Sequence, residues 1–216
     1  MKIFPLAAVA MLTVTAGCTA SGATTTTTHS GIGQSSEVVA AEVLDALAAG
    51  DAELAADMTV EEQMAWLAMA EGASLQDAAG LLDEGAREVA VNYWTGFTQS
   101  AAVPPVAIAS VDETRLGDHL FAVVQLGGGG DLRLVLRSEP DWRVDVVASF
   151  GSTLAARLAD AVQVVTANRG EGGDALRALM REQRDSVEMA ALDPSLNDDA
   201  VEALVNLAEA LDLLGS

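Results

Sequence analysis

The sequence predicts an α+β fold in which N-terminal helices pack on a four-stranded antiparallel meander and about three C-terminal helices follow. Two changes in hydrophobic period support this prediction. Apolar residues recur every three or four positions in the first section, up to residue 105, and again after residue 150, which is typical of amphipathic helices. Between these sections, short runs rich in β-branched residues alternate with glycine, proline and aspartate, which is typical of strands joined by turns.

The first helical section contains its own start and stop signals. Ser36 precedes an apolar stripe, and Gly50 stands where a left-handed helix end is tolerated. Thr59 and Glu62 have the spacing of a capping box, in which a hydroxyl and a carboxylate satisfy free amides at a helix start. We therefore expect a second helix over residues 60–71.

A third helix is predicted to begin after Ser74. Its apolar stripe continues as one longer helix to Phe97, although Gly80 and Gly85 each weaken it by up to about 1 kcal/mol relative to alanine. Pro104 and Pro105 end the section.

Four strands are expected next, at residues 106–111, 120–126, 132–136 and 142–147. In the last of them Trp142, Val144 and Val146 share one face and Arg143 and Asp145 the other, so we expect a sheet that is covered on one side and wetter on the other. The four glycines 127–130 are followed by neither lysine nor a helix start. They predict a hairpin turn rather than a phosphate-binding loop.

Helical periodicity returns in the third section. One stripe comprises Leu154, Leu158, Val162 and Val165, a second comprises Leu176, Met180 and Val187, and a third comprises Val201, Leu204, Ala208 and Leu211. Asp174 is expected to cap the second helix, and Pro194 separates the third. These helices either cover the free sheet face or form an appended bundle; the pattern leaves both arrangements open.

The N-terminus has the order of parts that a secretory signal needs. Met1 and Lys2 give a short positive end, residues 3–14 form an apolar run of about a dozen residues, and small residues follow. A membrane-spanning helix needs about 20 apolar residues, so this run is too short to remain as a span.

The step Thr15-Ala16-Gly17-Cys18 resembles the lipobox of bacterial lipoproteins, although leucine is commonest where this chain has Thr15. The resemblance implies cleavage before Cys18, diacylglycerol on its thiol, and a place on the extracytoplasmic side of the cell membrane. Cleavage without lipid and a free cysteine in an uncleaved helix are the alternatives. Because Cys18 is the only cysteine, no disulfide is expected in the domain.

Residues 19–36 carry five consecutive threonines with glycine and serine and little apolar bulk, which predicts a flexible tether. A coil of this length would span on the order of 25 Å. His29 lies in this segment without a nearby partner, so we expect no metal role for it.

The charge balance excludes one class of function. Eleven basic and 32 acidic residues give a formal net charge of −21, and Lys2 is the only lysine. Such a surface repels phosphate backbones, so we expect no nucleic-acid partner. The membrane would be reached through the lipid anchor rather than a basic patch.

Two motifs carry a second resemblance. The Ala48-Ala49-Gly50-Asp51 step after a first helix, and the strand ending Asp141-Trp142-Arg143-Val144-Asp145, resemble the cone-shaped domains of the nuclear-transport-factor-two and ketosteroid-isomerase superfamily. Such domains occur in many actinobacterial lipoproteins. The resemblance covers residues 37–150, but no clear strand lies between Gly50 and Tyr93, where that fold usually has one.

The predicted organisation is then a signal peptide at 1–17, a lipidated cysteine and tether at 18–36, a cone-like domain at 37–150, and a helical extension at 151–216. The resemblance implies a pocket enclosed by the curved sheet and the first helices. Its candidate wall gathers the aromatic and polarizable side chains of a chain that is only 4% aromatic: Trp66, Met69, Tyr93, Trp94 and Phe97. The alternative is that these residues only fill the core.

Few residues suggest catalysis. His119 follows Asp118, but neighbours on a strand point to opposite faces, so we expect a turn or surface imidazole rather than a dyad. Asp112 or Glu113 could act as buried acids, as carboxylates do in the isomerase branch. Met58, Met64 and Met69 are expected to fill the core, and no metal or other cofactor is expected.

These observations favour a non-catalytic module that binds a small apolar ligand or an envelope protein. One alternative is a pocket enzyme of isomerase or dehydratase type. The other is a structural protein that docks a partner through its acidic helices.

Overall fold

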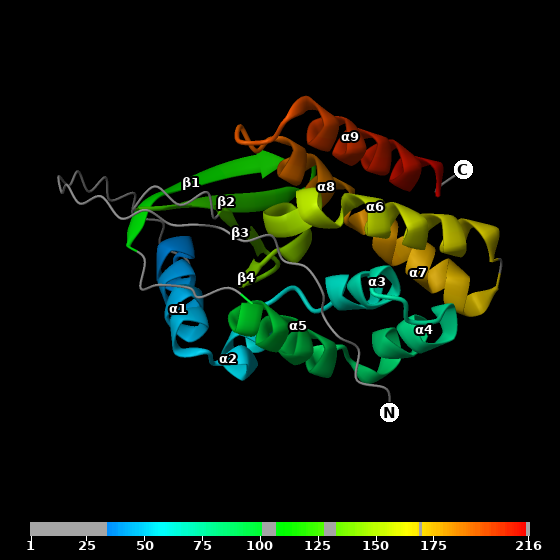
Figure 1. Ribbon diagram of the computed structural model, residues 1–216, viewed down its shortest axis with the longest axis horizontal. Coiled ribbons are helices and arrows are strands. Elements are labelled where there is room, and N and C mark those ends of the chain that lie inside the picture. The colour runs from blue at the N-terminus through cyan, green and yellow to red at the C-terminus, as the bar shows by residue number, and fades with distance from the viewer. Residues whose placement is uncertain (1–33, 101–106, 128–132, 169, 215–216) are drawn as a thin grey trace.

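The computed structural model describes residues 34–100, 107–127, 133–168 and 170–214. Within these ranges helices precede and follow a four-stranded antiparallel sheet with the order β1-β2-β3-β4, so the predicted α+β fold with a meander is confirmed (Figure 1). Cys18, residues 19–33 of the predicted tether and Pro104-Pro105 lie outside the described residues, whereas Ser36, which was predicted to belong to the tether, begins a helix. In the described part of the chain, no helix is long and apolar enough to cross a membrane.

The helices before the sheet are α1 (Ser36–Ala49), α2 (Ala52–Asp57), α3 (Gln63–Ala70), α4 (Leu75–Glu84) and α5 (Arg87–Ser100). Gly50 ends α1 at φ 72°, in the left-handed region, as predicted. Ser74 caps α4 by accepting the Asp77 amide, also as predicted. The single long helix from Ser74 to Phe97 is wrong, because Gly85 at φ 86° separates α4 from α5.

The capping box at Thr59 and Glu62 is also wrong. Thr59 is fully buried, its hydroxyl donates to the Ala55 carbonyl at 2.7 Å, and its backbone forms a parallel bridge with Val144. The α3 helix begins only at Gln63, and Glu62 precedes it without a side-chain cap. The hydroxyl that local spacing assigned to a helix start is therefore used by the Ala55 carbonyl in α2 and by the Trp94 indole N–H instead.

The sheet comprises β1 (Ile108–Leu116), β2 (His119–Leu126), β3 (Arg133–Ser138) and β4 (Trp142–Val144). Cross-strand partners divide its central strands into two faces. Ala122 pairs with Leu136 and Val124 with Leu134 on the face that joins the main core, where α1 packs. On the other face Phe121 pairs with Arg137 and Val123 with Val135.

Both faces of the central strands are covered, so the expected half-buried sheet is wrong. Phe121 and Val135 pack against Ala148 at the start of α6 and Met189 in α8. The fourth strand is also shorter than predicted. It ends at Val144, and Asp145, expected on the wetter face, is fully buried as the N-cap of α6.

The helices after the sheet are α6 (Val146–Ala167), α7 (Glu171–Glu182), α8 (Arg184–Ala191) and α9 (Asp198–Leu213). The α6 stripe is buried as predicted, at Leu154, Leu158, Val162 and Val165. The stripe through Leu176, Met180 and Val187 divides between α7 and α8. Asp174 does not cap α7, which begins at Glu171 after Gly170 without a side-chain cap.

The sequence left open whether the C-terminal helices cover the free sheet face or form a bundle, and the structure contains both arrangements. The α8 helix and the start of α6 cover the second sheet face. The α6 and α7 helices pack with α3, α7 also packs with α4, and α9 packs on α6 and α8 (Figure 1). One hydrophobic core runs from Val39 in α1 to Leu211 in α9. The domain boundary predicted after Phe150 falls inside α6, because that helix continues the chain directly from β4.

Candidate functional site

The predicted aromatic wall lies in the core. Trp66 and Trp94 are fully buried, and both indole N–H groups are satisfied, by the Leu158 carbonyl at 3.2 Å and the Thr59 hydroxyl at 2.8 Å. Met69 and Phe97 are buried beside them, Tyr93 is half-buried, and burial raises the pKa of the Tyr93 phenol. Trp94 makes edge-on ring contacts with Tyr93 and Phe97. None of the five lines the hollow described below.

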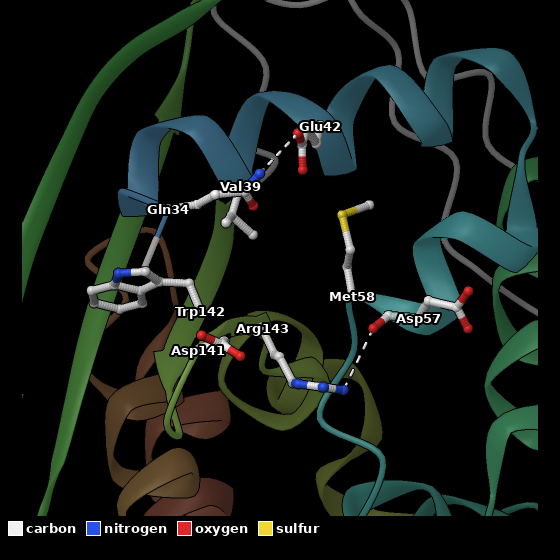
Figure 2. Close-up of a pocket in the computed structure, with 8 residues that line it drawn as sticks. All are labelled: Gln34, Val39, Glu42, Asp57, Met58, Asp141, Trp142 and Arg143. Carbon is white, nitrogen blue, oxygen red and sulfur yellow. Dashed lines mark hydrogen bonds between the residues drawn. The ribbon is translucent and has the colours of Figure 1, made fainter. Parts of the chain in front are cut away.

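That hollow lies where α1, the end of α2 and β4 meet, and has a volume of ≈ 320 Å³ (Figure 2). This volume is at the lower end of the range for small-molecule sites. The lining comes from three separate segments: Gln34, Val39 and Glu42; Asp57 and Met58; and Asp141, Trp142 and Arg143. Parts of the chain some hundred residues apart therefore build one site.

The apolar part of the lining is Val39, Met58 and Trp142. Val39 is buried on α1, whereas Met58 and Trp142 are half-buried. In Figure 2 the Met58 side chain extends from the end of α2 toward α1, and Trp142 lies below the first turn of α1. The hollow therefore offers a bound molecule a thioether, a branched aliphatic side chain and an indole.

The charged part of the lining comprises three carboxylates and the guanidinium of Arg143, and one of the carboxylates is already paired. Asp57 accepts from Arg87 Nε at 2.6 Å and Nη2 at 3.2 Å, and Glu53 lies 3.6 Å from the same guanidinium. The hydrogen bond from Arg87 holds the pKa of the Asp57 carboxyl below its ordinary value. Asp57 is therefore already neutralised from outside the hollow.

The other charged groups of the lining have fewer or weaker hydrogen-bond partners. Arg143 Nη1 makes a long contact to the Asp57 carbonyl at 3.4 Å (Figure 2) and a second one to the Thr59 carbonyl at 3.5 Å. Gln34 donates to Glu42 at 3.4 Å, and Asp141 is exposed. Within the described ranges, neither Glu42 nor Asp141 lies within ion-pair distance of a basic group.

A second polar centre lies between the sheet and α8. Asp145 accepts from Gln63 Nε2 at 2.7 Å, from the Ser186 hydroxyl at 2.6 Å and from the Ala148 amide at 2.8 Å. Arg137 Nη1 donates to Gln183 at 3.0 Å and to Ser186 at 3.2 Å. Gln63, Arg137, Asp145, Gln183 and Ser186 are each at most 2% exposed, and we call them the buried polar network. Their hydrogen bonds join α3, β3, α6 and α8.

His119 lies at the edge of this network between two carboxylates. Its Nδ1 is 2.9 Å from Asp185 and its Nε2 is 3.2 Å from Glu139, which in turn pairs with Arg137 at 2.7 Å. The imidazole is therefore held between α8 and the turn after β3, directly after the turn at Gly117 and Asp118, with 18% of its side chain exposed. Because both ring nitrogens face a carboxylate, neither is presented to a substrate. As predicted, His119 does not form a dyad with its neighbour Asp118.

The remaining candidates lie apart from both centres. Asp112 and Glu113 are exposed on β1, so they are not buried acids; Glu113 accepts from the Ser36 hydroxyl at 2.8 Å. Met64 and Met69 are buried in the core as predicted, but Met58 lines the hollow. In the part of the chain that the structure describes, no three His, Cys, Asp or Glu residues are placed to hold a metal ion.

Sequence reasoning missed the hollow because its lining is assembled from distant segments. Trp142 and Arg143 were noted only as strand residues. Glu42 and Gln34 carried no signal, since isolated polar residues on a helix are ordinary surface. Asp185, which lies 66 residues after His119, likewise has no local spacing that would connect the two.

Comparisons with protein-family models, with curated proteins and with solved structures found no match to this chain. The resemblances to the lipobox and to the cone-shaped domains therefore stay predictions.

Proposed function

We propose that this protein is a cell-envelope lipoprotein, held on the extracytoplasmic face of the membrane through Cys18, whose α+β domain binds a small ligand without transforming it. The observation that carries the binding proposal is the hollow beside Trp142. It combines apolar surface with charged groups at its rim, and sites of this composition are typical of small-molecule binding.

The tether predicted after Cys18 supports the same proposal. Gln34 lines the hollow and follows Cys18 by 16 residues. A flexible segment of this length would reach roughly 20 to 24 Å from the lipidated residue. A domain held in this way would keep the hollow close to the membrane surface, where an envelope protein meets its ligand.

Binding is favoured over the two alternatives by the placement of side chains. The one described histidine, the most common general acid–base, lies between Asp185 and Glu139 rather than at the hollow. Docking through an apolar patch needs contiguous exposed surface. The large exposed apolar side chains of the described residues are spread over α1, α2, α6, the end of α8 and α9, and only α9 carries two of them: Val38, Leu54, Val164, Leu192, Val205 and Leu213.

The anchor is tested by membrane fractionation and intact-mass measurement of the wild type and Cys18→Ala. We expect the wild type to sediment with membranes and to carry added diacylglycerol, and Cys18→Ala to be released. Thr15→Leu, which introduces the commonest lipobox residue, is the matched control and should remain membrane-bound. A purified wild type that retains Met1 and a free thiol at Cys18 would contradict the proposal.

The binding half is tested by native mass spectrometry of the full-length protein after incubation with an extract of cell-envelope small molecules. We expect a bound species in the wild type that is lost when Met58→Asp places a charge on the apolar lining. Retention of the same species by Met58→Asp would remove the hollow as its site.

A further inference from the structure

The lining of the hollow selects a class of ligand. This inference rests on the proposed function of the hollow as a binding site, and it concerns the charge of what binds there. Val39, Met58 and Trp142 provide apolar surface, while Glu42, Asp57, Asp141 and Arg143 provide charge. A ligand that fits must therefore have an apolar part and a charge that suits these groups.

The net charge of the hollow is negative. Asp57 is paired with Arg87, and Glu42 and Asp141 have no basic group within ion-pair distance in the described ranges. Arg143, whose Nη1 donates to two backbone carbonyls, keeps its charge and offsets only one of these two carboxylates. The chain as a whole carries a formal charge of −21, so the surrounding potential has the same sign. An anion approaching the hollow would be repelled. A neutral apolar molecule would displace the water that solvates the carboxylates of Glu42 and Asp141 and would offer them no hydrogen bonds in return.

An organic ammonium ion meets all of these conditions. Its N–H groups can donate to carboxylate oxygens, and its charge is attracted to the face of an indole such as Trp142. A bare divalent cation fits less well, because no three carboxylate or imidazole groups of the described residues converge as metal ligands. The apolar arm of an organic cation would instead use Met58 and Val39.

We infer that the hollow binds a small organic cation, with its ammonium group between Glu42 and Asp141 and its apolar part against Trp142 and Met58. The ammonium can come from a soluble amine or from an aminated lipid headgroup. Both sources are chemically equivalent at the hollow, and the tether proposed at Cys18 brings both within reach.

The test uses full-length protein in nanodiscs of phosphatidylglycerol, a lipid without an ammonium group, with empty nanodiscs as background. Three probes of matched shape are titrated: phenethylamine, 2-phenylethanol and phenylacetate, which are cationic, neutral and anionic at pH 7. Tryptophan fluorescence reports binding, because Trp66 and Trp94 are fully buried and Trp142 is half-exposed at the hollow. Trp142→Phe should abolish most of the signal while keeping an aromatic face.

We expect phenethylamine to bind about tenfold more tightly than either other probe. Equal or tighter binding of 2-phenylethanol or phenylacetate would overturn the cation assignment while leaving a binding hollow in place. Binding of none of the three, checked by calorimetry, would overturn the cation assignment, and the proposed function would then rest on the envelope-extract experiment alone.

Charge variants locate the effect. Glu42→Gln and Asp141→Asn should each weaken phenethylamine binding roughly two- to fivefold, the size expected for exposed ion pairs. Arg143→Gln should strengthen it. Asp45→Asn removes the same charge from α1 at a residue outside the lining, and should change binding less than twofold. If Asp45→Asn weakens binding as much as Glu42→Gln, the effect is that of net charge and the inference fails.

The lipid arm separates the two sources. Replacing half of the phosphatidylglycerol by phosphatidylethanolamine should weaken apparent phenethylamine binding at least about threefold if headgroups occupy the hollow, since they then compete for the same carboxylates. Unchanged binding would support the same ammonium site with a soluble amine as the ligand.

Discussion

Replacing Arg137 by methionine should destabilise the protein strongly. The Arg137 side chain is 2% exposed, lies 3.7 Å from the fully buried Asp145 carboxylate and donates to Gln183 and Ser186. Methionine fills a similar length but leaves Asp145 without its basic neighbour and Glu139 without its 2.7 Å partner. Removing one partner of a buried ion pair costs about 3 to 5 kcal/mol, because the other charge stays buried.

The measurement is the free energy of unfolding from urea titration followed by circular dichroism. A fall of about 3 to 5 kcal/mol at an unchanged slope would indicate lost stability rather than an altered unfolded state. Arg157→Met is the matched control, because Arg157 pairs with Glu71 at the surface, where both side chains are more than a third exposed. We expect it to cost no more than about 1 kcal/mol.

The double variant Arg137→Met with Asp145→Asn tests the reason for the loss. If the cost of Arg137→Met comes from the charge left on Asp145, removing that charge should make the double variant more stable than the sum of the single effects by at least about 1 kcal/mol. A loss below about 1 kcal/mol for Arg137→Met, or strict additivity in the double variant, would refute the reasoning.

Three further outcomes are expected. Gly117→Ala should cost about 1 to 3 kcal/mol in urea unfolding, because φ is +57° there and a Cβ would lie 2.2 Å from an Asp185 oxygen; wild-type stability would show that the turn can shift. In carbon-detected NMR, the Asp57 carboxyl should titrate below its ordinary pKa of 3.8 and move upward in Arg87→Gln, so the ion pair is present above that pH and lost as pH falls; no upward movement would exclude Arg87 as the cause. Trp142→Ala should cost about 1 to 3 kcal/mol, less than a fully buried tryptophan, and a loss above about 4 kcal/mol would place its indole in the core.

Local signals predicted elements well where local contacts decide the conformation. Gly50 ends α1 in the left-handed region, and the Ser74 hydroxyl caps α4, because both arrangements depend on backbone groups within one turn. The same reasoning was wrong at Thr59, where the partners are Ala55 and Trp94 rather than a following amide. A helix cap contributes about 1 kcal/mol, and at Thr59 two buried hydrogen bonds to other parts of the fold replace it.

Asp145 shows a second limit of sequence patterns. Its alternation with Trp142 and Val144 indicated a strand residue on a wet face, whereas it caps a 22-residue helix and is fully buried. Aspartate directly before a long apolar run is equally suited to be a helix N-cap, and this is the role that Asp145 has in the structure. The alternation typical of a strand and the periodicity typical of a helix overlap at Asp145, so the sequence pattern alone could not place the boundary between β4 and α6.

The candidate site was less predictable than the fold. The largest aromatic side chains were expected in a pocket wall, but large apolar surface is most stabilising when fully buried, and Trp66 and Trp94 are in the core. Trp142 lies at the hollow because β4 is an edge strand with α1 beside it. Such placement depends on how distant segments meet, which single-residue patterns do not contain.

The shared core has a consequence for biogenesis. Gln63 bonds to Gln183, 120 positions later, and the second sheet face is closed by Met189. A ribosome delivers the amino end first, so strands β2 and β3 would emerge long before the segments that shield Phe121 and Val135. Until synthesis is nearly complete, the nascent chain would expose the apolar face of β2 and β3, which is prone to aggregate. We therefore expect its folding to depend on chaperones that bind the unfolded chain.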